Sequence, residues 1–420
     1  MMKRGLKLLI TIAASAVALQ GTAQTTKVFK GQGPIRGVST VSRPVQRQWK
    51  GVFSQKGDDV FFRNDFQGGR LNGMVKLNDT LYTALITSEN TPVNSSPWYA
   101  FKVWAGTAKE ITLKLTYQQG SRHRYPPKLS KDGKLWTAVE PGDVKKVFEE
   151  DSLPGEYQFK MKVGKDTTWI AAQELFTSKH ANAWLDELRK KTKSSAEIIG
   201  YSRLGKPLTV VKMGNPKSKK RILVIGRQHP PEVTGQYAMK AFVETLNVGT
   251  ALSDKFLKEY LVYVIPLMNP DGVDNGNWRH NDGGIDLNRD WDAFNQPESS
   301  AVRDFLKKEI ADRGNQLIFS IDFHSTQDDI YYRVDPKLKG NMPNLISDWL
   351  TKTQEQIPGY VPNVKSLYNG GGTFTAFSYF FKQYGTESLV YEIGDNTPRD
   401  FIKHKGEVSA EILMNLLLNK

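Results

Sequence analysis

The sequence predicts an α/β domain preceded by an all-β sandwich, and a change of pattern along the chain carries this prediction. Residues 51–174 contain segments in which apolar and polar side chains alternate, such as Ile111–Tyr117. After about residue 175, the apolar side chains form short continuous runs separated by helix-like segments. Alternation is typical of half-buried strands, whereas continuous runs suit strands buried on both faces of a layered α/β fold.

Composition limits the kinds of site that this chain can build. It has 420 residues, six histidines, no cysteine and a formal net charge of +14. At roughly 100–200 residues per domain, the length suits two or three domains. The lack of cysteine excludes disulfides, thiolate-ligated metals and a thiol nucleophile. Any metal site must therefore use His, Asp and Glu.

The N-terminus predicts export. Three basic side chains within residues 1–7 precede the apolar run Leu8–Leu19, and Gly21-Thr22-Ala23 resembles a small-residue cleavage site. We expect residues 1–23 to be a signal peptide cleaved near Ala23, with the mature chain periplasmic or secreted. No later apolar stretch approaches the roughly 20 residues that a membrane span needs, and no Arg-rich run or RNP-type motif indicates nucleic-acid binding. Residues 24–50 are predicted as a linker or extended lead-in.

The predicted β-sandwich covers residues 51–174. Tyr157, Phe159, Met161 and Val163 alternate with polar residues, like the segment 111–117. Clusters of Gly, Pro, Asn and Asp at residues 67–69, 94–97 and 131–133 separate such segments and are typical of turns. A sandwich of about 120 residues accounts for this pattern.

The predicted α/β domain covers residues 175–420. Its expected strands are residues 221–225, 261–265, 317–321 and 389–391, and its expected helices are residues 236–246, 299–310, 344–356 and 407–418. The alternation of the two kinds of segment indicates a layered sheet with helices packed against it.

Candidate metal ligands follow two of these strands. His229 and Glu232 are three residues apart, and Pro231 between them could open a helix with Glu232 in its first turn. Alone, this pair is more typical of a surface turn. His324, at the end of another apolar run, would complete a site with two His, one Glu and an open position, a ligand set used by hydrolytic zinc.

Three further residues in strand-end segments could act on a substrate. Asn288 and Arg289 lie in a long, polar, Gly-rich loop and could together bind a carboxylate. Glu392 ends the run 389–391 and could serve as a general base, although a solvent-exposed edge Glu is the simpler interpretation.

Taken together, the motifs resemble those of the zinc metallocarboxypeptidases of the carboxypeptidase A superfamily. The matching stretches, in family order, are His229-Pro230-Pro231-Glu232, Asn269-Pro270-Asp271-Gly272, Trp278-Arg279, Asp286-Leu287-Asn288-Arg289, Asp322-Phe323-His324-Ser325 and Tyr391-Glu392. The bacterial relatives of the cytosolic carboxypeptidases are the most similar branch, because residues 64–71, 96–103 and 124–130 also resemble their N-terminal sandwich.

The resemblance implies a role for each matching residue. His229, Glu232 and His324 would bind one zinc ion, with Glu392 as general base acting on the zinc-activated water. Arg279 would stabilise the oxyanion, and Asn288 and Arg289 would hold the substrate's C-terminal carboxylate. Tyr368 would cap the bound substrate, although it stands about one residue too close to the glycines that follow. The implied catalytic fold is a mixed, mostly parallel sheet between helices.

The sequence therefore predicts an exported zinc metallocarboxypeptidase that acts on peptides or proteins with a free C-terminal carboxylate. Alternatives are a zinc hydrolase of the same fold acting on cell-wall peptides or other amides, and a deglutamylase-type carboxypeptidase. The uncharged segment Phe374-Thr375-Ala376 argues against the deglutamylase. From a different class, an inactive protein that binds peptides or anionic polymers is the remaining alternative. The sequence predicts no oligomeric state.

Overall fold

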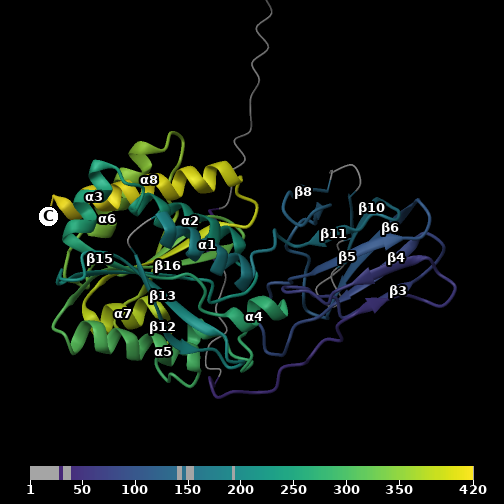
Figure 1. Cartoon of the computed structure of the whole chain (residues 1–420), viewed down its shortest axis with the longest axis horizontal. Helices are drawn as coiled ribbons and strands as arrows, with labels where there is room; N and C mark the ends of the chain where they lie inside the picture. The colour runs from purple at the N-terminus through teal and green to yellow at the C-terminus, as the bar shows by residue number, and fades with distance from the viewer. Residues whose placement is uncertain (1–27, 32–38, 140–143, 148–155, 192–193, 420) are drawn as a thin grey trace, which may run out of the picture.

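The computed structural model describes residues 28–31, 39–139, 144–147, 156–191 and 194–419. The predicted signal peptide, residues 1–23, lies outside the described residues. Figure 1 shows two lobes side by side, with the strand-rich N-terminal lobe at the right and the α/β lobe at the left.

The N-terminal lobe is a sandwich of two sheets. One sheet has the order β1 (Val52–Phe53), β2 (Val60–Arg63), β5 (Ala100–Ala105), β11 (Thr168–Ala171), β7 (Lys128–Ser130) and β8 (Thr137–Ala138). The other has the order β3 (Gly73–Lys76), β4 (Leu81–Ile86), β6 (Lys109–Tyr117), β10 (Glu156–Val163) and β9 (Val144–Val147). The alternating segments are strands as predicted: β6 buries Ile111, Leu113 and Leu115 against the other sheet and leaves the polar residues between them outside.

The α/β lobe is built on one eight-stranded sheet. Its order is β12 (Ser195–Tyr201), β13 (Pro207–Gly214), β15 (Tyr260–Ile265), β14 (Lys220–Gly226), β16 (Gln316–Thr326), β19 (Glu387–Gly394), β17 (Ile330–Val334) and β18 (Val364–Tyr368). The four central strands are parallel, and antiparallel pairs join them to the outer strands. The predicted α/β fold with a mixed sheet is confirmed.

Helices cover both faces of this sheet (Figure 1). On one face lie α1 (Ser178–Lys191), α2 (Val233–Leu246), α3 (Ala251–Glu259), α6 (Leu345–Gln356) and α8 (Arg399–Leu418), and on the other lie α5 (Pro297–Leu306) and α7 (Ala376–Tyr384). In β14, Ile222 and Val224 pack toward α2 and α8, whereas Leu223 and Ile225 pack toward α5. Both faces of the strand are buried, which explains its continuous apolar run.

The predicted helices are present, but their ends differ. Helix α8 begins at Arg399 rather than at residue 407. Its first two turns are mostly polar in sequence, which hid them, yet Lys405 there is fully buried and its Nζ lies 2.6 Å from Oδ2 of Asp329. Helix α5 begins at Pro297 and ends at Leu306, where a π-helical turn over Lys307–Ala311 follows.

Residues 39–50, the longer of the two described parts of the lead-in, contain no helix or strand and join the two lobes. Arg43 N donates to Gly283 O (2.9 Å), and Gln46 N donates to Glu89 O (2.6 Å). Arg47 forms an ion pair with Asp282 at 2.6 Å. The lead-in is therefore packed and extended rather than a free linker.

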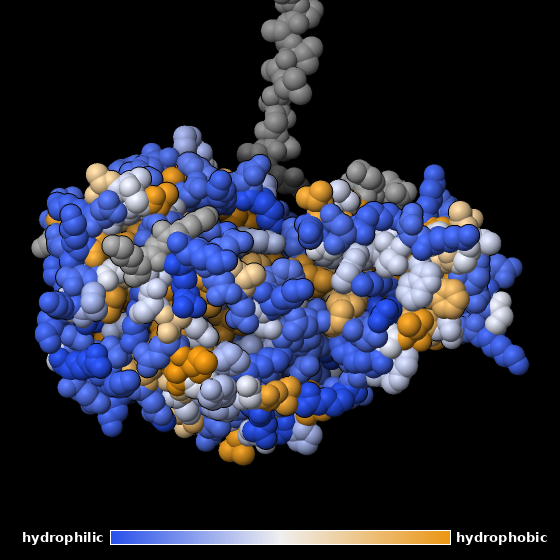
Figure 2. Space-filling view, in the orientation of Figure 1, coloured by the Kyte–Doolittle hydropathy of each residue, from blue (hydrophilic) through white to orange (hydrophobic). Residues whose placement is uncertain are grey.

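The outer surface is mixed in character. On the face that Figure 2 shows, apolar side chains are scattered among hydrophilic ones. Scattered exposed apolar residues are usual and need no partner to explain them. Among the described residues, every helix is too short or too polar to span a bilayer.

Candidate metal centre and active site

The candidate site lies at the carboxyl ends of the parallel strands. His229 follows β14, His324 is near the end of β16, and Glu392 is near the end of β19. Because β16 and β19 are parallel and in register, His324 and Glu392 are direct neighbours across the sheet. Ligands of open α/β sheets bind at this edge, so the fold brings together residues far apart in sequence.

The turn after β14 differs from the prediction in one detail. The prediction allowed Pro231 to open a helix with Glu232 in its first turn, but α2 begins at Val233, and Glu232 is the residue just before it. Glu232 has φ −82° and ψ 66°, which is not helical. Its N–H contacts the carbonyl of His229 at 3.4 Å, so the backbone turns before the helix starts. This turn directs the Glu232 carboxylate back toward His229.

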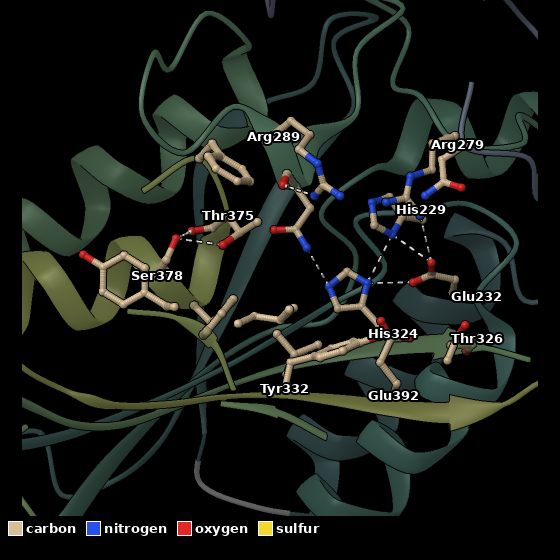
Figure 3. A pocket seen from close by; sticks show the side chains of 18 of the residues that line it. His229, Glu232, Arg279, Arg289, His324, Thr326, Tyr332, Thr375, Ser378 and Glu392 are labelled. Atoms are coloured by element: carbon tan, nitrogen blue, oxygen red, sulfur yellow. Dashed lines mark hydrogen bonds and ion pairs between the residues drawn. The ribbon is translucent and has the colours of Figure 1, made fainter. Parts of the chain in front are cut away.

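His229, Glu232 and His324 converge on one point (Figure 3). Nδ1 of His229 lies 2.8 Å from Oε1 of Glu232, and Nδ1 of His324 lies 2.7 Å from Oε2. The two Nδ1 atoms are 3.2 Å apart, and all three side chains are buried. Two imidazole nitrogens and a carboxylate that face one another are a donor set that zinc prefers.

A second set of carboxylates orients both imidazoles. Nε2 of His229 lies 2.9 Å from Oδ1 of Asp286, and Nε2 of His324 lies 2.8 Å from Oδ2 of Asp322. Carboxylates in this position fix each ring so that its other nitrogen faces a metal. The residues present therefore fit a zinc ion held by His229, Glu232 and His324.

The charges around Glu232 favour its ionised form. Burial alone would raise the pKa of Glu232, but the charges and hydrogen bonds of His229 and His324 hold that pKa well below its usual range. The pKa of His324 is raised well above its usual value, because Asp322 and Glu232 outweigh the opposing effect of burial. The cluster therefore keeps Glu232 in its ionised form, which is the form that binds a cation.

Glu392 lines the same cavity and is only partly buried. Its Oε2 has no hydrogen-bond partner among the described residues. Burial and the nearby charge of Glu232 raise the pKa of Glu392 to about 8. A divalent cation held by Glu232 would oppose this shift, because it favours a neighbouring carboxylate in its charged form.

Arg279 reaches the cavity from the loop between α4 (Pro270–Asn275) and the short helix Leu287–Arg289. Its Nε donates to Oδ2 of Asp286 (2.8 Å), and its Nη1 lies 3.5 Å from Oε1 of Glu232. The side chain is 7% exposed. Its guanidinium is therefore held beside the candidate metal ligands (Figure 3).

Asn288 and Arg289 lie side by side on the same cavity wall. Oδ1 of Asn288 accepts a hydrogen bond from Ala376 N (2.9 Å), and its Nδ2 lies 3.3 Å from Nε2 of His324. Nη1 of Arg289 donates to the Asn288 carbonyl (2.6 Å). The pair presents donors to the cavity, as binding of a carboxylate requires.

Tyr368 also lines the cavity, but as a buried wall residue. Its hydroxyl donates to Gly371 O (3.2 Å), and its ring packs edge-on against Phe381 with the centroids 6.0 Å apart. The capping role stays a prediction.

The cavity measures about 350 Å³. Away from the candidate metal ligands its wall is neutral and contains Tyr332, Leu367, Phe374, Thr375, Phe377, Ser378 and Val390. Among the described lining residues, the charged side chains are those of the predicted site residues Glu232, Arg279, Arg289 and Glu392, besides the two histidines.

Two functional contacts escaped the sequence analysis. Asp322 could have been found, because strand residues two apart share a face and Asp322 therefore points to the same side as His324. Asp286 belongs to one of the matching stretches, but its contact with His229 had no such signal, since it comes from an irregular loop 57 residues after His229.

A family model described as zinc carboxypeptidase matches residues 181–417. Among curated proteins, cytosolic carboxypeptidase 3 of Bos taurus is 24% identical over 309 residues, which are 65% of this chain but 30% of that protein. Cytosolic carboxypeptidase 6 of Mus musculus is 32% identical over 154 residues, covering 34% of this chain and 28% of that protein. The chain thus spans less than a third of the length of these relatives.

Solved structures show the same fold over most of the chain. A metallo-carboxypeptidase from Burkholderia cenocepacia aligns with TM-score 0.72 and 18% identity, over 86% of this chain and 99% of that one. A metallo-carboxypeptidase from Pseudomonas aeruginosa aligns with TM-score 0.67 and 21% identity, over 85% and 98%. Both alignments extend beyond the α/β lobe and include most of the sandwich.

Proposed function

The chain belongs to the zinc carboxypeptidase family, and on that basis we propose that it is an enzyme that removes the C-terminal residue from peptides or proteins. One observation carries the proposal. A single cavity is lined by three converging metal ligands, by the unpartnered carboxylate oxygen of Glu392 and by the Asn288–Arg289 pair. These are the groups needed to hold a C-terminal carboxylate next to a hydrolytic centre.

Each group has a distinct part in the proposed reaction. Zinc, when bound, supplies a Lewis acid that polarises a carbonyl and acidifies a water. Asn288 and Arg289 bind the terminal carboxylate, and Arg279 donates to the oxygen of the scissile carbonyl as negative charge develops there. Glu392 takes the proton of the attacking water and delivers it to the leaving amine.

The neutral wall of the cavity favours a neutral C-terminal side chain. Tyr332, Phe377 and Val390 offer apolar contacts, and Thr375 and Ser378 are uncharged. Burying a glutamate side chain against this wall would leave its carboxylate without a counter-charge, which is costly. A deglutamylase-type specificity is therefore disfavoured.

Paired substrates separate this proposal from amide hydrolysis in general. We expect a peptide that ends in a free carboxylate to be cleaved about 10- to 100-fold faster than its C-terminal amide, because a hydrogen bond to a charged group contributes about 1.5–3 kcal/mol. Peptides that end in Phe, Leu or Glu then test the neutral wall. Equal cleavage of carboxylate and amide would favour the cell-wall or general amide hydrolase, and preference for Glu would favour the deglutamylase.

Export is a separate proposal, supported by the basic, apolar and small-residue pattern of residues 1–23. We expect the full chain, expressed in a bacterial host, to be recovered outside the cytoplasm with Gln24 as its first residue. N-terminal sequencing of the fractionated protein measures this. Cytoplasmic protein that still begins at Met1 would contradict it.

A further inference from the structure

We propose that the β-sandwich is a working part of the active site, in which Glu89 positions Arg279 and Arg124 positions the strand that carries Glu392. The proposal rests on the function proposed above, because it concerns the same site. Both residues act through others and contact no reacting atom, so they are positioning residues.

Glu89 follows β4 of the sandwich and is fully buried, but it serves a loop of the α/β lobe. Its carboxylate accepts hydrogen bonds from three consecutive backbone amides, those of Trp278 (2.7 Å), Arg279 (3.0 Å) and His280 (2.8 Å). Nδ1 of His280 lies 3.0 Å from the same carboxylate. A carboxylate with four acceptor sites can satisfy all three amides at once, whereas a neutral amide side chain cannot.

This anchor fixes the point from which the Arg279 side chain extends. From there Arg279 reaches Asp286, and Asp286 in turn contacts His229. A shift of the backbone at Arg279 would therefore move its guanidinium away from the position where oxyanion charge develops. An error of about 1 Å in such a group can lower turnover about 100-fold.

Arg124 makes the second connection, from the loop after β6. Its Nε donates to Oδ2 of Asp395 (2.7 Å), which directly follows β19, and its Nη2 donates to the Ser325 carbonyl of β16 (3.4 Å). Both members of the Arg124–Asp395 ion pair are buried. One guanidinium of the sandwich thus ties together the strand ends that carry His324 and Glu392.

The interface also contains an ion pair outside the cavity, which Gln173 connects to the carbonyl of Asp395. Arg399 of α8 forms a bidentate ion pair with Glu174, with Nε–Oε1 3.0 Å and Nη2–Oε2 2.7 Å. This pair also joins the α/β lobe to the end of the sandwich, yet neither residue lines the cavity. Substitutions there provide matched controls for lost packing between the lobes.

The first test compares Glu89→Gln with Glu174→Gln in the full-length, zinc-loaded protein. For Glu89→Gln we expect kcat to fall about 10- to 100-fold with KM within about threefold, because the lost alignment matters in the transition state. Zinc content should stay at one ion per chain. For Glu174→Gln we expect kcat within about twofold of wild type, even where its melting temperature falls as much as that of Glu89→Gln. Equal kcat in the two variants would overturn the role of Glu89.

The second test needs no activity. Hydrogen–deuterium exchange at the amides of residues 278–280 should be at least about tenfold faster in Glu89→Gln than in wild type, and unchanged in Glu174→Gln. Unchanged exchange in Glu89→Gln would overturn the proposal. If that variant does not fold, Glu89→Asp replaces it with the same expectation, since the shorter side chain cannot reach all three amides. If the wild type cleaves no peptide, the proposed function is wrong. The exchange result still shows whether Glu89 holds the backbone of residues 278–280 in place.

Arg124→Lys and Arg399→Lys form the matching pair for the second anchor. Lysine keeps the charge but cannot bridge Asp395 and Ser325 with a planar fork. We expect kcat to fall about tenfold in Arg124→Lys, with zinc content and KM retained, and to stay near wild type in Arg399→Lys. Equal kcat in both would overturn the role of Arg124.

Discussion

Asp286 offers the sharpest test of the metal centre, because one carboxylate there contacts three site residues. Its Oδ1 faces Nε2 of His229 (2.9 Å) and accepts from Asn288 N (2.9 Å), and its Oδ2 accepts from Nε of Arg279 (2.8 Å). In Asp286→Asn one oxygen becomes an NH₂ group. That group must face either Arg279 or the Asn288 amide, so two donors oppose each other.

The size of the effect follows from the contact with His229. Loss of a carboxylate partner of a ligating histidine typically lowers metal affinity 10- to 100-fold, or about 1.4–2.7 kcal/mol. The opposed donors also displace Arg279, so we expect kcat/KM to fall further than zinc affinity does. Asp282→Asn is the matched control, since Asp282 lies in the same loop but pairs with Arg47.

A zinc titration against a competing chelator measures this prediction. We expect the dissociation constant to rise at least about tenfold in Asp286→Asn and less than about twofold in Asp282→Asn. Unchanged zinc affinity in Asp286→Asn would refute the inference that Asp286 orients His229 for a metal.

Three further predictions concern turnover, metal removal and pH. Glu392→Gln should lower kcat about 100- to 10,000-fold while zinc stays bound, and unchanged turnover would exclude Glu392 as general base. Chelation should abolish peptide cleavage and added zinc should restore it. At about 100 times its dissociation constant, zinc should also add about 2.7 kcal/mol to the free energy of unfolding, and activity in metal-free protein would contradict the family assignment. Burial raises the pKa of Glu298 from 4.5 to about 7, so its ionisation opposes folding. Its contribution to stability is lost as pH rises from about 4.5 to 7, by about 3 kcal/mol in total at 1.36 kcal/mol per pKa unit. The free energy of unfolding of Glu298→Gln, measured with denaturant, should lack this loss. If it depends on pH in the same way in the variant and in wild type, Glu298 does not cause the loss.

The sequence predicted the central strands of the α/β lobe well, because burial on both faces leaves an unambiguous apolar run. The outer strands β12, β13, β17 and β18 escaped it. Strand β18 is largely exposed, and β12 buries little of its length, so neither carries a clear pattern. Helix α7 was also missed, since it is short and rich in aromatic residues with low helix propensity.

The candidate ligands could be named from the sequence because each lies in a short motif at a strand end. The contacts between the lobes that are proposed to position Arg279 and Glu392 could not, because they join distant segments. Glu89 and the amide of Trp278 are 189 residues apart, and Arg124 and Asp395 are 271 residues apart. No local periodicity indicates such pairs. The sandwich stretches at residues 64–71 and 124–130 could therefore be identified by their resemblance to the family, but the contacts that they make could not be predicted.

The charges of the site explain why two lobes are needed to build it. A buried carboxylate is stable only where hydrogen bonds and opposite charges compensate it. Asp395 lies one residue beyond β19, where burial raises its pKa and Arg124 opposes that rise. The strand ends of the α/β lobe supply carboxylates around the cavity, but the cation that pairs with Asp395 comes from the sandwich. Conversely, the buried carboxylate of Glu89 finds its donors in the α/β lobe. Because each lobe contains a buried charge that the other compensates, neither would keep its present structure at the interface alone. The functional unit therefore includes both.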